Sequence, residues 1–168
     1  MAKEVGDRAG EGQAYGNLGC AYRSQGDYAK AIEYHTQHLT ISKEVGDRAG
    51  QGIAYENLGI AYDSQGDFAK AISYQMQHLA SAKEVGDRVG EGEAYGDLGS
   101  CHMHLNEYVE AVAYFEAQHA LAISMTLAHV QSDVALKMGV ALTHHVRAVR
   151  QGSATGAEPS QSRSSRTA

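Results

Sequence analysis

The chain has 168 residues and a formal net charge of −6, so it lacks the basic footprint by which nucleic-acid-binding domains are recognised. No stretch is apolar for long enough to predict a membrane span, and residues 1–10 lack the apolar segment of a signal peptide. The two cysteines, Cys20 and Cys101, are too few for a disulfide framework, and we read both as packed free thiols. We therefore expect a cytoplasmic protein that binds neither nucleic acid nor membrane.

The first residues already match later parts of the chain. Residues 2–8, AKEVGDR, return as SKEVGDR at 42–48 and as AKEVGDR at 82–88. At the later positions this segment closes one predicted helix and opens the next, with glycine as the C-cap and aspartate as the N-cap. We expect residues 1–9 to be the end of a truncated preceding repeat, with Gly6 ending its helix and Asp7 capping the next. On this interpretation the chain begins within a unit, as a piece of a longer array would.

Three similar units follow at a spacing of 40 residues, and we assign them to 10–49, 50–89 and 90–130. Residues 3–42 and 43–82 are identical at 28 of 40 positions, and a period of this length predicts a solenoid. Each unit has two segments in which apolar residues recur at i, i+3, i+4 and i+7, the one-sided pattern of a packed helix. A pair such as Gly26–Asp27 separates the segments, and Asn106 takes the place of glycine in the third unit. Each unit is therefore predicted to be an antiparallel helix pair.

One glycine recurs inside the first helix of every unit, at Gly19, Gly59 and Gly99, and again at Gly139. A glycine inside a helix costs about 0.8–1.0 kcal/mol relative to alanine. A cost repeated in every unit indicates a packing reason. We predict that the missing side chain lets the two helices of a pair approach closely.

The last part of the chain departs from the repeat. Residues 134–142, VALKMGVAL, align with AYGNLGCAY at 14–22, and we predict a degenerate capping helix over 131–149 that shields the last apolar face. Residues 150–168 contain the chain's only proline and have no apolar periodicity, so we expect a disordered tail there.

A set of aromatic, leucine, glycine and alanine residues recurs in the units. The first unit has Tyr15, Leu18, Gly19, Tyr22, Ala31 and Tyr34, and the second has Tyr55, Leu58, Gly59, Tyr62, Ala71 and Tyr74. The third unit keeps this pattern but has His102 in place of the second tyrosine. The pattern resembles the tetratricopeptide repeat family, in a 40-residue variant similar to the Leu-Gly-Asn repeats of Pins-type G-protein-signalling modulators. The resemblance implies an all-α, right-handed solenoid of helical hairpins, here with three repeats and a C-terminal capping helix.

In that family the first helices of the units line a concave groove that binds partner peptides or helices. Carried over by position, the resemblance implies these groove residues: Gln13, Asn17, Cys20, Arg23, Ile53, Glu56, Asn57, Ile60, Asp63, Glu93, Asp97, Ser100, Met103 and His104. The copies also differ most at such positions. The asparagine of Leu-Gly-Asn is replaced here at residues 20, 60 and 100, so only Asn17 and Asn57 lie near its place. Four carboxylates, at residues 56, 63, 93 and 97, make the later groove acidic, and we expect a basic or amphipathic protein or peptide as partner.

No motif predicts catalysis, a cofactor or a metal site. His35 and His38 have the spacing of a possible ligand pair, but His35 falls on the packed stripe, where Gln75 and Phe115 replace it in the other units. A metal site needs further converging donors, and the sequence contains no phosphate-binding glycine loop. We expect a non-enzymatic interaction scaffold. Two alternatives stay open: a structural or self-assembling repeat segment, and a piece of a larger multidomain protein whose activity lies outside this chain.

Overall fold

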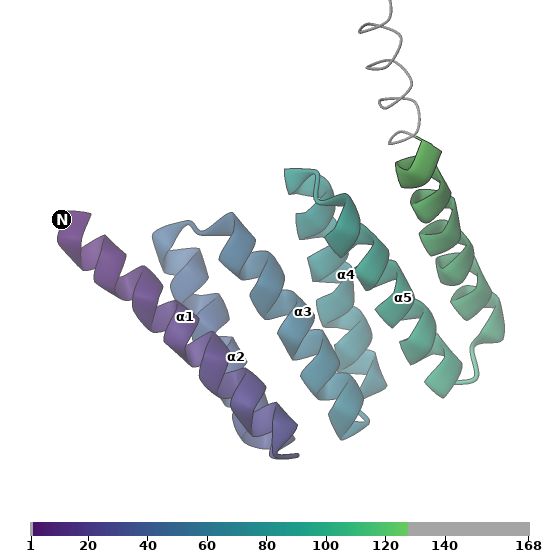
Figure 1. The fold of residues 1–168 in the computed structure, drawn as a ribbon. Coiled ribbons are helices and arrows are strands. Elements are labelled where there is room, and N and C mark those ends of the chain that lie inside the picture. Colours follow the sequence, from purple (N-terminus) through teal and green to yellow (C-terminus); the bar gives the residue numbers. More distant parts are fainter. Residues whose placement is uncertain (1, 128–168) are drawn as a thin grey trace, which may run out of the picture. The chain divides into compact units, whose positions relative to one another are not determined.

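The computed structural model describes the backbone of residues 2–127 and the side chains of residues 8–127, and this part of the chain is helical throughout (Figure 1). Short turns separate the helices α1 (Ala2–Ser24), α2 (Tyr28–Val45), α3 (Arg48–Gln65), α4 (Phe68–Val85), α5 (Arg88–His104) and a sixth that is described over 108–127. Each helix packs against the next along the chain, which gives three consecutive helix pairs. The predicted all-α solenoid of helical hairpins is confirmed. The predicted capping helix (131–149) and tail (150–168) lie outside the described residues.

The turns between helices have the predicted caps. Gly66 ends α3 in the left-handed conformation (φ 86°), and the side chain of Asp67 then accepts a hydrogen bond from the backbone N–H of Lys70 at 3.2 Å. The same arrangement recurs at Gly26–Asp27, Gly46–Asp47 and Gly86–Asp87. In the third pair Asn106 adopts the left-handed conformation (φ 61°), as its place in the sequence predicts.

The predicted helix end at Gly6 is wrong. Helix α1 runs from Ala2 through Gly6 and Asp7 to Ser24 without a turn. The equivalent turn at Gly46 lies between α2 and α3, which pack on each other and hold it in place. No described helix precedes α1, so no such packing holds a turn at Gly6, and α1 continues through it.

The recurring glycines lie where the helices of a pair meet, and this confirms the predicted close approach. A Cβ on Gly19 would fall 2.5 Å from the His35 ring, one on Gly59 would fall 2.6 Å from the Gln75 amide, and one on Gly99 would fall 2.7 Å from the Phe115 ring. The residues opposite the glycines are therefore equivalent in the three pairs. Gly139 lies outside the described residues.

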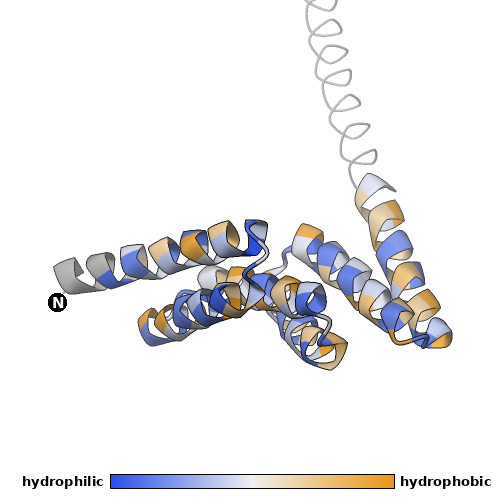
Figure 2. Cartoon of the chain, turned by 90° about the horizontal axis from the view of Figure 1, so that it is seen from below, coloured by the Kyte–Doolittle hydropathy of each residue, from blue (hydrophilic) through white to orange (hydrophobic). Residues whose placement is uncertain are grey.

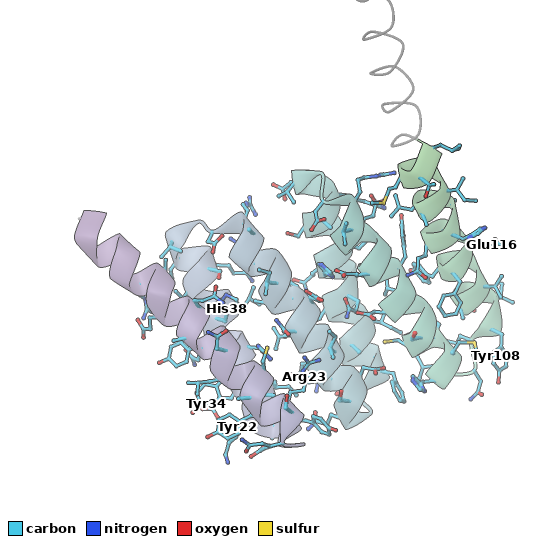
Figure 3. The ribbon with its side chains drawn as sticks, in the orientation of Figure 1. Tyr22, Arg23, Tyr34, His38, Tyr108 and Glu116 are labelled. Carbon is cyan, nitrogen blue, oxygen red and sulfur yellow. The ribbon has the colours of Figure 1, made fainter. Side chains whose placement is uncertain are left out.

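Stacked rings support each pair beside this contact. Tyr22 stacks on Tyr34 with ring centroids 5.2 Å apart (Figure 3), and the second pair repeats the contact between Tyr62 and Tyr74 at 5.4 Å. In the third pair the His102 ring stacks on Tyr114 at 5.3 Å. His102 therefore substitutes for tyrosine in packing as well as in position.

An apolar seam joins consecutive pairs. Leu39 of α2 packs with Ala54 and Leu58 of α3, and half-buried Ile32 and Tyr55 cover this cluster. Figure 2 shows apolar and hydrophilic residues sharing each helix, as helices with one packed side require. No helix within residues 2–127 has the length and apolar content needed to cross a membrane.

The first helix exposes residues that are buried in the later units. Leu18 is 43% exposed, whereas its equivalents Leu58 and Leu98 are fully buried at 0%. Ala14 and Ala21 are exposed in the same way. The side of α3 that packs on α2 is thus repeated on α1, where no described helix covers it.

Candidate partner-binding face

The first helices of the three pairs lie side by side, and all fourteen predicted groove residues belong to them. Helix α3 contacts α1 on one side and α5 on the other. We call the surface formed by α1, α3 and α5 the first-helix face. Two cavities between α3 and α5 open along it.

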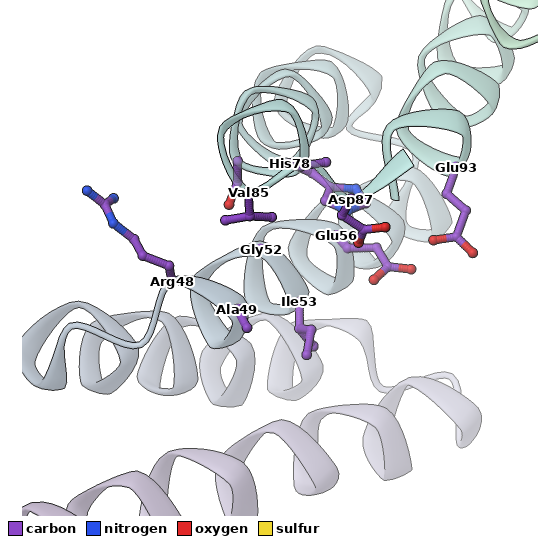
Figure 4. Close-up of a pocket in the computed structure, with 11 residues that line it drawn as sticks. Arg48, Ala49, Gly52, Ile53, Glu56, His78, Val85, Asp87 and Glu93 are labelled. Carbon is purple, nitrogen blue, oxygen red and sulfur yellow. The ribbon is translucent and has the colours of Figure 1, made fainter. Parts of the chain in front are cut away.

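The first cavity, of about 180 Å³, lies where the start of α3 meets the end of α4 and the start of α5 (Figure 4). Ile53 and Val85 contribute apolar surface, and three carboxylates line it at Glu56, Asp87 and Glu93. The remaining lining residues are Arg48, Ala49, Gly52, His78, Ser81 and Ala82. Such a site accommodates an apolar stem that carries a positive charge.

The charges around the first cavity are unevenly compensated. Burial raises the pKa of Glu56 above its usual range, and the neighbouring carboxylate of Glu93 raises it further, although the charge of Arg23 acts in the opposite direction. The guanidinium of Arg48, which lines the cavity, lies 3.6 Å from the Glu84 carboxylate, and the two form an exposed ion pair. The cavity wall therefore has three carboxylates, and its one arginine is paired with Glu84.

His78 is the buried polar group of this cavity. It is 5% exposed, and its Nδ1 has no hydrogen-bond partner among the described residues. Burial lowers its pKa, although the carboxylates of Asp97, Glu93 and Asp87 act in the opposite direction. The net effect favours the neutral form of His78 even in this acidic surrounding.

The second cavity, of about 70 Å³, lies further along the same two helices. Its lining includes four predicted groove residues, Ile60, Asp63, Asp97 and Ser100, together with Gln75 and Cys101. Burial raises the pKa of Asp97 to about 6, and the nearby Glu56 carboxylate adds to this effect. Both cavities thus contain carboxylates whose charge is costly in the free protein.

The predicted residues on α1 have a different environment. The Cys20 thiol donates to Asn57 Oδ1 at 3.7 Å, and the Asn57 amide donates to the Ile53 carbonyl at 3.0 Å. Asn57 therefore joins α1 to α3, while Gln13 and Asn17 are exposed. Arg23 is half-buried on α1 and labelled in Figure 3.

The last two predicted residues lie at the end of α5. Met103 is exposed, and the His104 ring stacks on Phe68 of α4 with centroids 4.7 Å apart. Neither residue lines the two cavities. The structure therefore gathers Ile53, Glu56 and Glu93 in one cavity and residues 60, 63, 97 and 100 in the other, and leaves the remaining predicted residues outside both.

Among the cavity residues that the sequence did not predict, three polar ones lie outside the first helices. Gln75 and His78 come from α4, and Asp87 is the N-cap of α5. A signal was available: Gln75 and His78 are polar residues on the packed side of a second helix. Gln75 faces Gly59, and the space above a glycine lets such a side chain reach the first-helix face.

The comparisons with known proteins agree with this architecture. The family described as tetratricopeptide repeat matches residues 1–44 and 10–84, and a second description of the same repeat matches residues 92–118. The chain belongs to the tetratricopeptide repeat family. Repeats of this family are generally protein-interaction scaffolds and typically non-catalytic, and no enzyme family matches the chain. A search of the curated proteins gives no match.

Two solved structures show the same fold. The tetratricopeptide domain of Arabidopsis FLU superposes with a TM-score of 0.66 at 22% identity, over 70% of this chain and 98% of that one. BtubC (BKLC) from P. vanneervenii superposes with a TM-score of 0.65 at 16% identity, over 94% of this chain. The match spans 53% of BtubC, about half of its length.

Proposed function

We propose that this chain is a non-enzymatic scaffold of the cytoplasm that binds a basic or amphipathic peptide along the first-helix face. The observation that carries the proposal is the pair of cavities between α3 and α5, which are lined by Glu56, Asp63, Glu93 and Asp97. Burial and mutual repulsion raise the pKa of Glu56 and of Asp97. A positively charged partner relieves both effects, because a nearby cation favours the ionised carboxylate.

The similarity to Leu-Gly-Asn repeats of Pins-type modulators adds little about the partner. The position of their asparagine is taken by Cys20, Ile60 and Ser100, and Asn57 is already bonded to Cys20 and to the Ile53 carbonyl. A role in G-protein circuitry therefore rests on repeat length and helix patterning alone. The acidic cavities are the stronger guide to the partner.

The experiment uses fluorescence anisotropy with a labelled amphipathic lysine–leucine peptide and a glutamate–leucine peptide of the same length. We expect binding of the basic peptide that weakens with rising salt, and no binding of the acidic one. Glu56→Lys should weaken binding about tenfold. Glu33→Lys, which changes the charge equally at an exposed position on α2, is the matched control. Equal effects of the two variants, or binding that ignores salt, would refute the proposal.

Self-association is a second candidate, and the exposure of Leu18 favours it. The equivalent Leu58 packs against α2 within the chain, so α1 carries a copy of a surface that is known to bind a second helix of this repeat. A head-to-tail contact that does not close into a ring extends with concentration. Light scattering after size exclusion tests it: the mass should grow with concentration, and Leu18→Lys should abolish the growth. A constant monomer mass would exclude this candidate.

A further inference from the structure

The second cavity is lined by six residues from three helices. Ile60 and Asp63 come from α3, Gln75 comes from α4, and Asp97, Ser100 and Cys101 come from α5. Its volume is about 70 Å³, which suits a single small polar group rather than a whole side chain.

Each donor group on the wall already makes one hydrogen bond. The Gln75 amide donates to Asp97 Oδ2 at 2.7 Å, and the Cys101 thiol donates to Asp63 Oδ1 at 3.5 Å. The Ser100 hydroxyl donates to the Gly96 carbonyl at 2.9 Å. These contacts fix both carboxylates in place, but they leave little donor capacity facing the cavity.

Acceptors on the wall remain in surplus. Gln75 is 1% exposed, and its Oε1 has no hydrogen-bond partner among the described residues. Asp63 and Asp97 are each bonded through one carboxylate oxygen, and each carboxylate has a second oxygen that can accept. A buried acceptor without a donor is costly, and two nearby carboxylates add a demand for positive charge. The wall therefore complements a small cation that carries hydrogen-bond donors.

The equivalent place between the first and second helix pairs does not carry these carboxylates. Between the first and second pairs, Arg23 stands where Asp63 stands, and Asn57 stands where Asp97 stands. The Cys20 thiol donates to Asn57 there, at 3.7 Å. The scaffold thus accepts a basic and a neutral residue at these places, so the two carboxylates are not required for stacking the repeats.

We propose that the second cavity binds a primary ammonium group, the end of a lysine side chain of the partner peptide. An ammonium is a compact point charge with three donors and no acceptor, which matches a wall of carboxylates and an unpaired amide oxygen. The planar guanidinium of arginine is larger and suits the wider first cavity better. This inference rests on the proposed function, since it names the group of the bound peptide that the second cavity recognises.

The direct test uses the full chain and a small probe, Nα-acetyl-lysine methylamide, followed by nuclear magnetic resonance of the backbone amides. The control probe carries a second acetyl group on Nζ, which removes the charge and two donors. We expect saturable shifts at Ser100 and Cys101 with the lysine probe only. Equal shifts with both probes, or no shift at these residues, would overturn the proposal.

Substitutions of the two aspartates distinguish the loss of a charge in the cavity from a loss of folding. Asp63→Asn and Asp97→Asn should each weaken the lysine probe about tenfold, in line with loss of a charge-assisted hydrogen bond. Glu33→Gln, an equal charge change at an exposed site on α2, should leave the probe affinity unchanged. Asp97→Asn introduces the residue that occupies the equivalent position 57, so circular dichroism is expected to report an intact fold. Unchanged affinity in both aspartate variants would overturn the proposal.

Failure of this inference is distinguishable from failure of the proposed function. If the amphipathic peptide binds and Glu56→Lys weakens it, but Nζ-acetylation of each lysine in turn leaves affinity unchanged, the first-helix face is correct and the ammonium site is wrong. If the lysine probe occupies the cavity and no peptide binds, the ammonium site is correct and the peptide-binding function is wrong.

Discussion

The imidazole of His35 lies directly over Gly19, so that a Cβ on residue 19 would fall 2.5 Å from the ring carbon Cε1. His35 is fully buried, and neither ring nitrogen has a hydrogen-bond partner among the described residues. The ring therefore has no polar contact that directs it elsewhere and no solvent into which it could move. The helix pair α1–α2 is held at the distance that this contact permits.

Gly19→Ala is expected to destabilise the array by about 1–3 kcal/mol, since overpacking a filled contact costs more than alanine gains in helix propensity. Urea unfolding followed by circular dichroism measures the change. Gly10→Ala is the control, because it lies in the same helix with no atom within 4 Å of the added Cβ. That variant should gain about 0.5–1 kcal/mol. A gain at both positions would contradict the packing role of Gly19.

His35 also predicts a dependence of stability on pH. Burial lowers its pKa from 6.5 to about 4, and the charges of Arg23 and His38 add to the effect. The unfolded chain therefore binds this proton more readily than the folded one. The contribution of His35 to the free energy of unfolding is complete above pH 6.5 and is lost as the pH falls toward 4.

His35→Gln should reduce the loss of stability between neutral pH and pH 4 by about 3 kcal/mol at most. Gln75 already packs against Gly59 in the equivalent place, so glutamine is the least disruptive replacement. Urea unfolding across this pH range measures the difference between variant and parent. His119→Gln, at an exposed position, should leave the profile unchanged. A variant with the full pH dependence of the parent would show that His35 does not titrate as described.

The fold could be predicted from the sequence because its determinants are local and repeated. Glycine–aspartate pairs set the turns, and Gly19 and its equivalents set the contact within each pair. Other features depend on neighbours in space. Gly6 and Gly46 lie in the same sequence segment, KEVGDR. Only Gly46 lies between two packed helices, so of the two only Gly46 forms a turn. Leu18 is equivalent to Leu58 in the sequence, yet it is exposed because no described helix packs on that side of α1.

The candidate site was predictable only in part. Four of its carboxylates, at residues 56, 63, 93 and 97, lie on first helices at positions that vary between the copies, whereas Asp87 is an N-cap that recurs in every unit. Gln75 and His78 belong to a second helix, where a packed position indicates a structural role. Whether a packed polar residue reaches the first-helix face depends on the side chain opposite it, which is absent at Gly59. The 40-residue repeat of the sequence does not by itself reveal a contact between a side chain of one helix and a glycine of another.

Asn106 provides a test of the turn in the third pair. It holds the left-handed conformation (φ 61°), and its Oδ1 accepts a hydrogen bond from the Tyr108 hydroxyl at 2.8 Å. Asn106→Ala should cost about 1–2 kcal/mol, because alanine is strained in this conformation. Asn106→Gly loses the same hydrogen bond without the strain and should be close to neutral. Thermal unfolding compares them, and equal losses would assign the effect to the hydrogen bond instead.

Asp97 is expected to lower the stability of the free protein at neutral pH. Burial and the carboxylates of Glu56, Asp63 and Glu93 raise its pKa from 3.8 to about 6, although His78 acts in the opposite direction. The folded chain therefore binds this proton more tightly than the unfolded one. The stabilisation is present below pH 3.8 and is lost as the pH rises through 6. Asp97→Asn removes a charge that the fold disfavours.

Asp97→Asn should accordingly raise the free energy of unfolding at pH 7.5 by about 1–2 kcal/mol, a figure reduced for the partial solvent exposure of the side chain. The gain should shrink toward zero near pH 4, where the aspartate is protonated in the fold, and urea unfolding at both pH values measures it. The Gln75 amide can still donate to an asparagine at 97, so the cavity wall keeps its structure. Glu33→Gln, on the exposed side of α2, controls for net charge and should change little at either pH. A loss of stability at pH 7.5 would mean that Asp97 has a compensating partner, and the surplus of acceptors in the second cavity would no longer explain why a cationic ligand binds there.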